Sequence, residues 1–269
     1  MWWLTKRKKV DIISAGWLEG MTDIHCHLVP AVDDGSRSLD ESRQLVEAMR
    51  SIGIRRIITT PHIYRRYPHN DSNTLQQGLE RLLPDLSDLG VPLTLGAEYM
   101  MDEGFETQLA KPLLTLGSSK YLLVETSFVG APLDLYGLIQ SVISAGAIPM
   151  LAHPERYLYM DDGEYSRLRG AGCAFQLNLF SLTGMYGEQV EKRAQQLLER
   201  GFYNFVGTDT HRIDFFRKTI SSAKTYARYE EPIRSLISNN QTLVASLRAN
   251  SYFEVLGEKP PTKKLTEVN

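Results

Sequence analysis

The chain has 269 residues, of which 42% are hydrophobic and 23% charged, and its formal net charge is −2. These values are typical of a globular protein that folds in water, and a near-neutral total gives no support for nucleic acid as a partner. No stretch approaches the roughly 18 continuous apolar residues that cross a bilayer, and the charges at 6–9 arrive too early for a signal peptide. The two cysteines, Cys26 and Cys173, make no disulfide framework. We therefore expect a cytoplasmic protein without stable membrane insertion.

Short apolar strands alternate with amphipathic helices along most of the chain. Residues 1–20 precede them as a predicted extension, with an apolar patch at Ile12, Ile13 and Trp17 that could dock on the body. A capping-box sequence, Ser38 followed by Glu41, opens the first helix, which stops at Gly53. The predicted strands are 21–28, 55–60, 91–97, 121–124, 147–152, 173–177 and 202–206, and the later helices are 75–89, 133–145, 165–171, 189–200, 218–228, 232–238 and 242–249.

Seven strand-helix units with nearly continuous apolar strands indicate a parallel sheet that is covered on both faces. Strict alternation favours a closed or nearly closed α/β barrel, although an open doubly wound sheet has the same periodicity. We expect a single barrel domain at 21–257, followed by a polar C-terminal tail at 258–269.

The first predicted strand carries a possible metal-binding motif. His25 and His27 are two residues apart, so in a strand their side chains point to the same face. A turn with Asp33, Asp34 and Gly35 then returns a carboxylate towards them. Histidines and a carboxylate at a strand end suit a divalent metal ion. Taken alone, however, the motif fits two structural histidines equally well.

The same residue types recur where other predicted strands end. Five of the six histidines, and four acidic residues, occupy such positions; His69 falls in a loop. In a parallel barrel all strands end on one face, where active sites are built. We therefore expect one cleft that contains His25, His27, Asp34, His62, Glu98, Glu125, His153, Asp209 and His211.

Nine candidate ligands exceed the three or four that one zinc ion takes. Mixed histidine and carboxylate ligands without a thiolate suit a cluster of two or three Mn²⁺, Fe²⁺, Mg²⁺ or Zn²⁺ ions. If all four carboxylates are ligands, three divalent ions leave a surplus of about two positive charges, which matches a phosphate dianion.

Six segments together resemble the polymerase-and-histidinol-phosphatase (PHP) superfamily: H-C-H-L-V-P-A-V-D-D-G, I-T-T-P-H, G-A-E-Y, L-V-E, L-A-H-P-E-R-Y and G-T-D-T-H. Within it they are most similar to the bacterial manganese-dependent protein-tyrosine phosphatases of the CpsB/YwqE type, over about residues 21–217. The resemblance implies a distorted seven-stranded TIM-like barrel with three Mn²⁺ ions on the nine residues named above. It gives Arg156 a phosphate-binding role and implies a second arginine after His211, with Arg217 the better match and Arg212 the alternative.

This resemblance implies a phosphatase that removes phosphate from phosphotyrosine on a protein, such as a bacterial tyrosine kinase of capsule or exopolysaccharide export. A hydroxide bridging two ions would attack phosphorus. A cysteine nucleophile is excluded because Cys-x5-Arg is lacking: Val32 and Leu179 stand where arginine is required. Two alternatives remain, namely a small-molecule phosphatase of the histidinol-phosphate type and a metal-binding regulatory subunit without catalysis.

Overall fold

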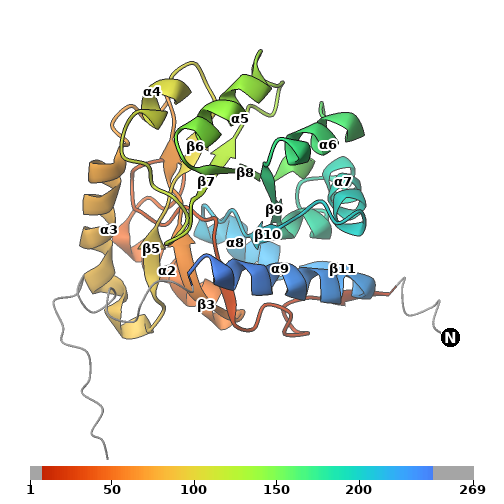
Figure 1. Ribbon diagram of the computed structural model, residues 1–269. Helices are drawn as coiled ribbons and strands as arrows, with labels where there is room; N and C mark the ends of the chain where they lie inside the picture. Colours follow the sequence, from red (N-terminus) through yellow and green to blue (C-terminus); the bar gives the residue numbers. More distant parts are fainter. Residues whose placement is uncertain (1–7, 245–269) are drawn as a thin grey trace, which may run out of the picture.

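The computed structural model describes residues 8–244, which form a distorted parallel barrel surrounded by helices (Figure 1). Its strands belong to two parallel sheets. The smaller sheet has the order β2 (Met21–Asp23), β3 (Ile54–Thr59), β5 (Leu93–Leu95). The larger has the order β10 (Phe205–Gly207), β9 (Ala174–Asn178), β8 (Ile148–Ala152), β7 (Tyr121–Glu125), β6 (Glu98–Met100), β4 (His62–Ile63).

The nine strands occupy seven positions around the barrel, because two of the positions are interrupted. Thr60 and Pro61 separate β3 from β4, and Gly96 and Ala97 separate β5 from β6. Across these breaks Gly96 N donates to Thr59 O at 2.8 Å, and the next hydrogen bond joins Glu98 N to Pro61 O at 3.2 Å. Each interrupted pair therefore continues as one strand that changes direction just below the carboxyl end of the barrel.

The barrel closes between β10 and the chain that follows β2. Asp209 N donates to His25 O at 2.7 Å, and His27 N donates to Thr210 O at 2.8 Å. Lower in the barrel, the Asn240 amide of α9 (Glu230–Thr242) donates to one backbone carbonyl of each strand, at 2.8 and 2.6 Å. The predicted closed seven-stranded barrel in a single domain is confirmed.

Helices cover the outside of the barrel, and apolar side chains fill its interior. Ile24, Ile58, Leu123 and Met150 meet inside, where Leu243 closes the bottom. A larger core lies between strands and helices. These helices are α2 (Leu39–Ser51), α3 (Ser72–Leu86), α4 (Phe105–Leu109), α5 (Leu135–Ser144), α6 (Asp162–Gly170), α7 (Glu188–Glu199), α8 (Ile213–Ile220) and α9, with 3₁₀ turns η1 (Ser87–Leu89), η2 (Pro154–Arg156), η3 (Leu179–Thr183) and η4 (Ala227–Tyr229).

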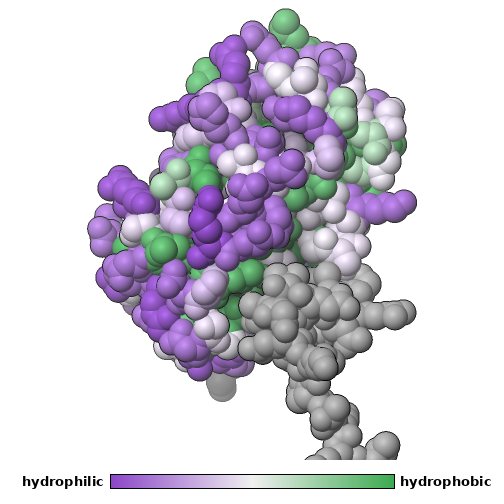
Figure 2. All heavy atoms as spheres, turned by 90° about the vertical axis from the view of Figure 1, so that its left-hand side faces the viewer, coloured by the Kyte–Doolittle hydropathy of each residue, from purple (hydrophilic) through white to green (hydrophobic). Residues whose placement is uncertain are grey.

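The outer face on the α3 side is mainly hydrophilic, with small hydrophobic areas between the charged side chains (Figure 2). Such a surface matches the amphipathic pattern of α3, whose Leu75, Leu79 and Leu82 are buried. Within residues 8–244, no helix is long and apolar enough to cross a membrane.

Some predicted elements were wrong. The predicted helix at 218–228 ends with α8 at Ile220, and β11 (Lys224–Tyr226) follows. β11 pairs antiparallel with β1 (Lys9–Asp11), so a partner over 200 residues away decided its conformation. The strand predicted at 21–28 shortens to β2, because beyond Asp23 threonine hydroxyls replace backbone partners: Cys26 N and Leu28 N donate to Thr side chains at 3.2 and 3.0 Å.

The segment before β2 packs against the body. Ile12, Trp17 and Leu18 are buried in the outer core, so the predicted docking of this apolar patch is confirmed. The predicted tail at 258–269 and the end of the helix predicted at 242–249 lie outside the described residues.

Candidate metal centre

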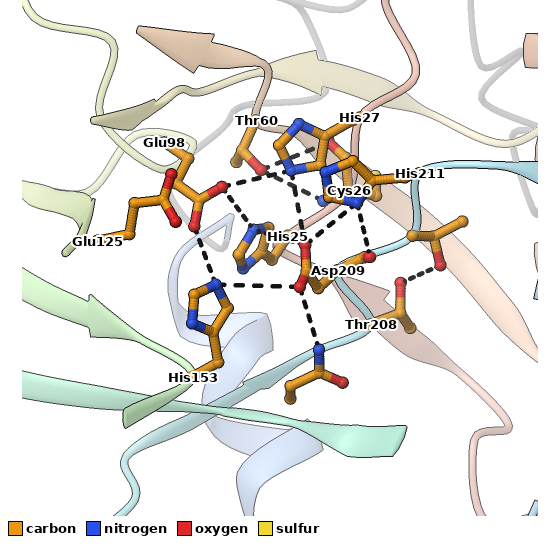
Figure 3. A network of polar contacts seen from close by, with 12 residues as sticks. His25, Cys26, His27, Thr60, Glu98, Glu125, His153, Thr208, Asp209 and His211 are labelled. Carbon is orange, nitrogen blue, oxygen red and sulfur yellow. Dashed lines mark hydrogen bonds and ion pairs between the residues drawn. The ribbon is translucent and has the colours of Figure 1, made fainter. Parts of the chain in front are cut away.

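The predicted ligands converge at the carboxyl end of the barrel (Figure 3). His25 and His27 follow β2, and Glu125 ends β7. Asp34 lies in the loop before α2, and the remaining residues stand at the starts or just after the ends of other strands. Most of their side chains are buried, with Glu98 and His153 each 1% exposed, while the His211 side chain is 24% exposed. Asp34 differs, because its side chain is 54% exposed on the rim. The structure therefore brings together all nine residues: His25, His27, Asp34, His62, Glu98, Glu125, His153, Asp209 and His211.

Glu98 lies at the middle of this cluster. Its Oε2 is 3.1 Å from His25 Nε2, 3.4 Å from His27 Nε2 and 3.3 Å from His62 Nδ1. Its Oε1 is 3.2 Å from His153 Nε2. One buried carboxylate thus faces four imidazoles, an arrangement that is typical of ligands around shared cations.

The donor atoms divide into three overlapping groups, each with its atoms within 4.8 Å of one another. The groups are His27, His62 and His211; His25, Glu98, His153 and Asp209; and His62, Glu98 and Glu125.

Several of these atoms lack a hydrogen-bond partner within residues 8–244. They include Nε2 of His25 and of His27 and both carboxylate oxygens of Glu98. Leaving a buried polar atom unpaired costs about 1–3 kcal/mol, so four such atoms in one place need an additional binding partner. Imidazole nitrogens and carboxylates without a thiolate are the ligand set of divalent ions, and the residues present therefore fit a metal centre.

Residues behind the ligands fix the orientation of the two first histidines. His25 Nδ1 is 2.9 Å from Gln176 Oε1, and His27 Nδ1 is 2.9 Å from Asp33 Oδ2. Because both acceptors need a proton on Nδ1, Nε2 of each ring is left as the lone-pair nitrogen that faces the centre. Gln176 was not predicted from the sequence, since nothing in its strand distinguishes it from a core residue.

The two adjacent aspartates have different positions. Asp33 is fully buried and also accepts from His62 N at 2.9 Å, so both its oxygens are engaged with the protein. Asp34 Oδ1 lies 3.4 Å from His62 Nε2 and 3.6 Å from His211 Nε2. Asp34 thus faces two of the predicted histidine ligands at the rim, whereas Asp33 contacts His27 from behind.

Backbone constraints hold this arrangement in place. His153 and Asp209 have positive φ angles of 34° and 54°, which cost energy for residues with side chains. A Cβ atom at Gly35 would lie 2.4 Å from His27 Cβ, and one at Gly207 would lie 2.7 Å from His25 Cβ. Only glycine permits the backbone at 35 and at 207 to lie so close to these two histidines.

Proton affinities in the metal-free centre follow from its charge. Burial lowers the pKa of His25, but the carboxylates of Glu98 and Asp209 outweigh it and raise the pKa to about 10. Burial also lowers the pKa of His211, and with nearby His27 brings it to about 4. In the absence of cations, protons on selected histidines balance the buried carboxylates, and a divalent ion would replace them.

A cavity of about 220 Å³ opens above the cluster, and Arg156 lines it. Its Nη1 donates to Asp209 Oδ2 at 2.6 Å, and its guanidinium lies 4.3 Å from the Phe128 ring centre. Arg212 also lines the cavity. Arg217 does not: it is exposed on α8, where Nη2 donates to Gln44 Oε1 at 3.1 Å. Of the two arginines predicted after His211, Arg212 therefore lines the cavity and Arg217 lies on α8 outside it.

A closed parallel barrel with buried histidines and carboxylates at its carboxyl end defines the class of barrel proteins built to bind metal ions there. The family described as capsular polysaccharide synthesis, CpsB/CapC, matches residues 21–243, and the chain belongs to this family.

Named relatives support the assignment. The chain is 33% identical to the tyrosine-protein phosphatase YwqE of Bacillus subtilis, over 72% of this chain and 78% of that protein. It is 28% identical to the tyrosine-protein phosphatase CpsB of Streptococcus pneumoniae, over 72% and 84% of the two chains. A crystal structure reported for YwqE and CpsB as metal-dependent tyrosine phosphatases matches with a TM-score of 0.75 and 30% identity, covering 84% of this chain and 94% of that one.

Proposed function

We propose that the protein is a metal-dependent phosphatase that hydrolyses phosphotyrosine on proteins. The observation that carries the proposal is one cavity in which unpaired, buried imidazole and carboxylate atoms lie beside a partly buried arginine. The relatives named tyrosine-protein phosphatases and the metal-dependent phosphatase structure support the same activity.

The nine ligands would hold three divalent ions, and Mn²⁺ is our first choice, with Fe²⁺, Mg²⁺ or Zn²⁺ as the other candidates. The three overlapping groups of donor atoms support this number. Such ions, when bound, polarise phosphoryl oxygens and lower the pKa of water.

The chain's own residues bind and orient the substrate. Arg156 has five N–H donors in a planar fork, which fits two oxygens of a phosphate group. Arg212 Nε donates to Glu41 Oε1 at 3.0 Å, which fixes the second guanidinium at the rim of the cavity. The leaving phenolate of tyrosine has a pKa of about 10, so it departs with little need for a proton from the enzyme. We assign phosphate binding to Arg156 and Arg212, and this choice replaces Arg217.

The family description, capsular polysaccharide synthesis, supports a bacterial tyrosine kinase of polysaccharide export as the phosphorylated partner. We place the reaction in the cytoplasm, because Cys26 and Cys173 are both free thiols.

The test compares turnover of a phosphotyrosine peptide with that of histidinol phosphate by the Mn²⁺-loaded full chain. We expect the peptide to be the better substrate. Faster hydrolysis of histidinol phosphate would assign a small-molecule phosphatase instead. If the protein hydrolysed no aryl phosphate, the remaining hypothesis would be a metal-binding regulatory subunit without catalysis. Glu98→Gln is the control for contaminating phosphatases, since Glu98 touches four of the histidines.

A further inference from the structure

Three aromatic rings and one arginine form a continuous row along one wall of the cavity. Phe128 follows β7, Arg156 ends η2, Tyr186 follows η3 and Phe215 lies on α8. The Arg156 guanidinium carbon is 4.3 Å from the Phe128 ring centre and 4.5 Å from that of Tyr186. The rings of Tyr186 and Phe215 are 6.4 Å apart. All four residues line the same cavity.

The two rings beside Arg156 limit how its guanidinium can be used. Phe128 and Tyr186 both lie within cation–π distance of it, which leaves the edge of the fork as the accessible part. Asp209 takes one donor of that edge at 2.6 Å. The remaining in-plane donors are available to an anion, so Arg156 fixes where a phosphate group would lie along the row.

The outer rings of the row remain open to solvent. Phe128 is 47% exposed and Phe215 is 43% exposed, whereas most large apolar side chains of the described chain are buried. Each presents a free apolar surface to a cavity whose floor is made of charged and polar ligands. An apolar surface of this kind, beside a phosphate position, needs a ligand whose non-phosphate part is itself apolar and flat.

We propose that Phe128 and Phe215 are specificity-determining residues that contact the aromatic ring of an aryl phosphate whose phosphate group Arg156 holds. The inference deepens the proposed function, on which it rests, by assigning the choice of aryl over alkyl phosphomonoesters to these two rings. An alkyl phosphate of serine would reach the ligands but leave both rings uncovered.

Replacement of Phe215 can test contact with the aryl ring without disturbing Arg156. Phe128 contacts both the cavity and the guanidinium, so its replacement could also displace Arg156. Phe215 contacts Tyr186 and has no recorded ring contact with Arg156 among the described residues. Replacement of Phe215 therefore removes an aromatic surface while leaving the rings beside the arginine in place.

The experiment measures calorimetric binding of phenylphosphonate and methylphosphonate to the Mn²⁺-loaded full chain. Variants are Phe128→Leu and Phe215→Leu, which keep bulk but remove the flat ring. We expect each to weaken phenylphosphonate by roughly 2- to 13-fold, the range for one aromatic pair. Methylphosphonate, which has the same charged group without the ring, should stay within about 2-fold. Val129→Ala is the matched control, because Val129 follows Phe128 but is 94% exposed and does not line the cavity.

Three results would overturn the inference. The first is unchanged phenylphosphonate affinity in both variants, and the second is equal weakening of both phosphonates. The third is weakening in one variant only, which would assign the aryl contact to a single ring. Turnover of a phosphotyrosine peptide by the wild type is measured alongside. If the wild type binds both phosphonates but hydrolyses no aryl phosphate, the proposed function fails while the binding ratios still decide the role of the rings.

Discussion

The floor of the cavity and its aromatic wall are built by different principles. Floor residues such as His25 and Glu98 lie next to or at the end of strands and are buried, and hydrogen bonds and close backbone contacts fix His25. Wall residues such as Phe128 and Phe215 come from a loop and a surface helix and are nearly half exposed. A rigid floor suits a centre that must hold several cations at set distances, whereas the wall can vary with the substrate without disturbing the barrel.

The largest expected effect comes from removing the metal ions from the floor of the cavity. Chelation of the purified protein should abolish phosphatase activity, and Mn²⁺ should restore it best among Mn²⁺, Mg²⁺, Fe²⁺ and Zn²⁺. Alkylation of thiols should have little effect, because Cys26 is fully buried and burial raises the pKa of Cys173 to about 12. Elemental analysis measures the ions directly, and a single equivalent of zinc would refute the cluster.

Substitutions of Arg156, Arg212 and Arg217 test which arginines bind phosphate between the floor and the wall of the cavity. Arg156→Lys should lower kcat on an aryl phosphate by roughly 10²- to 10³-fold, because lysine has neither the planar fork nor the fit between two rings. Arg212→Lys should lower kcat/KM, since Arg212 lines the cavity. Arg217→Lys should stay within about 2-fold, as a surface substitution.

A large loss in Arg217→Lys together with a normal Arg212→Lys would contradict this assignment. Circular dichroism and thermal melting of the three variants provide the control for folding.

Substitutions of Asp33 and Asp34 test whether ion binding at the floor depends on residues that lie behind the predicted ligands. Asp33→Asn should weaken ion affinity by roughly 10- to 100-fold without changing the number of ions at saturation, because Asp33 contacts His27 Nδ1 and both its oxygens are engaged with the protein. Asp34→Asn should instead remove one ion, since Asp34 Oδ1 faces His62 and His211. Titration with Mn²⁺ followed by elemental analysis separates affinity from stoichiometry, and exchanged outcomes would reverse the two roles.

The difference between floor and wall also explains what the sequence could predict. His25, His62, Glu98 and Asp209 were found because each stands beside a predicted strand end, and a parallel barrel brings all such ends to one face. The closed barrel was found for the same reason, from the alternation of apolar strands and helices.

Other features depend on contacts that spacing does not encode. Gln176 can be identified as part of the site only from its hydrogen bond to His25, and Phe128 only from its contact with Arg156. Arg212 lines the cavity and Arg217 does not, because α8 begins at Ile213. The sequence predicted that this helix begins at 218. β11 became a strand because β1 lies beside it.

The smallest expected effect is a change in the pH dependence of stability. In the metal-free protein the pKa of His25 is raised to about 10 from an ordinary 6.5, so its contribution is complete below pH 6.5 and is lost as the pH rises towards 10. His211 acts oppositely, since its pKa is lowered to about 4 and protonation below pH 6.5 destabilises the fold. The melting temperature of metal-free protein should therefore be highest near pH 6.5. Each kcal/mol lost corresponds to roughly 2–4 °C for a chain of about this size.

Bound ions should abolish the fall in melting temperature that the metal-free protein shows between pH 6.5 and 10. A divalent ion takes the place of the proton on His25, so the loaded protein has no such proton to lose between pH 6.5 and 10. The difference in melting temperature between loaded and metal-free protein should accordingly widen as the pH rises. Differential scanning calorimetry of both forms at a series of pH values measures it. A constant difference across this range would mean that His25 does not exchange a proton for an ion, and would remove it from the ligand set.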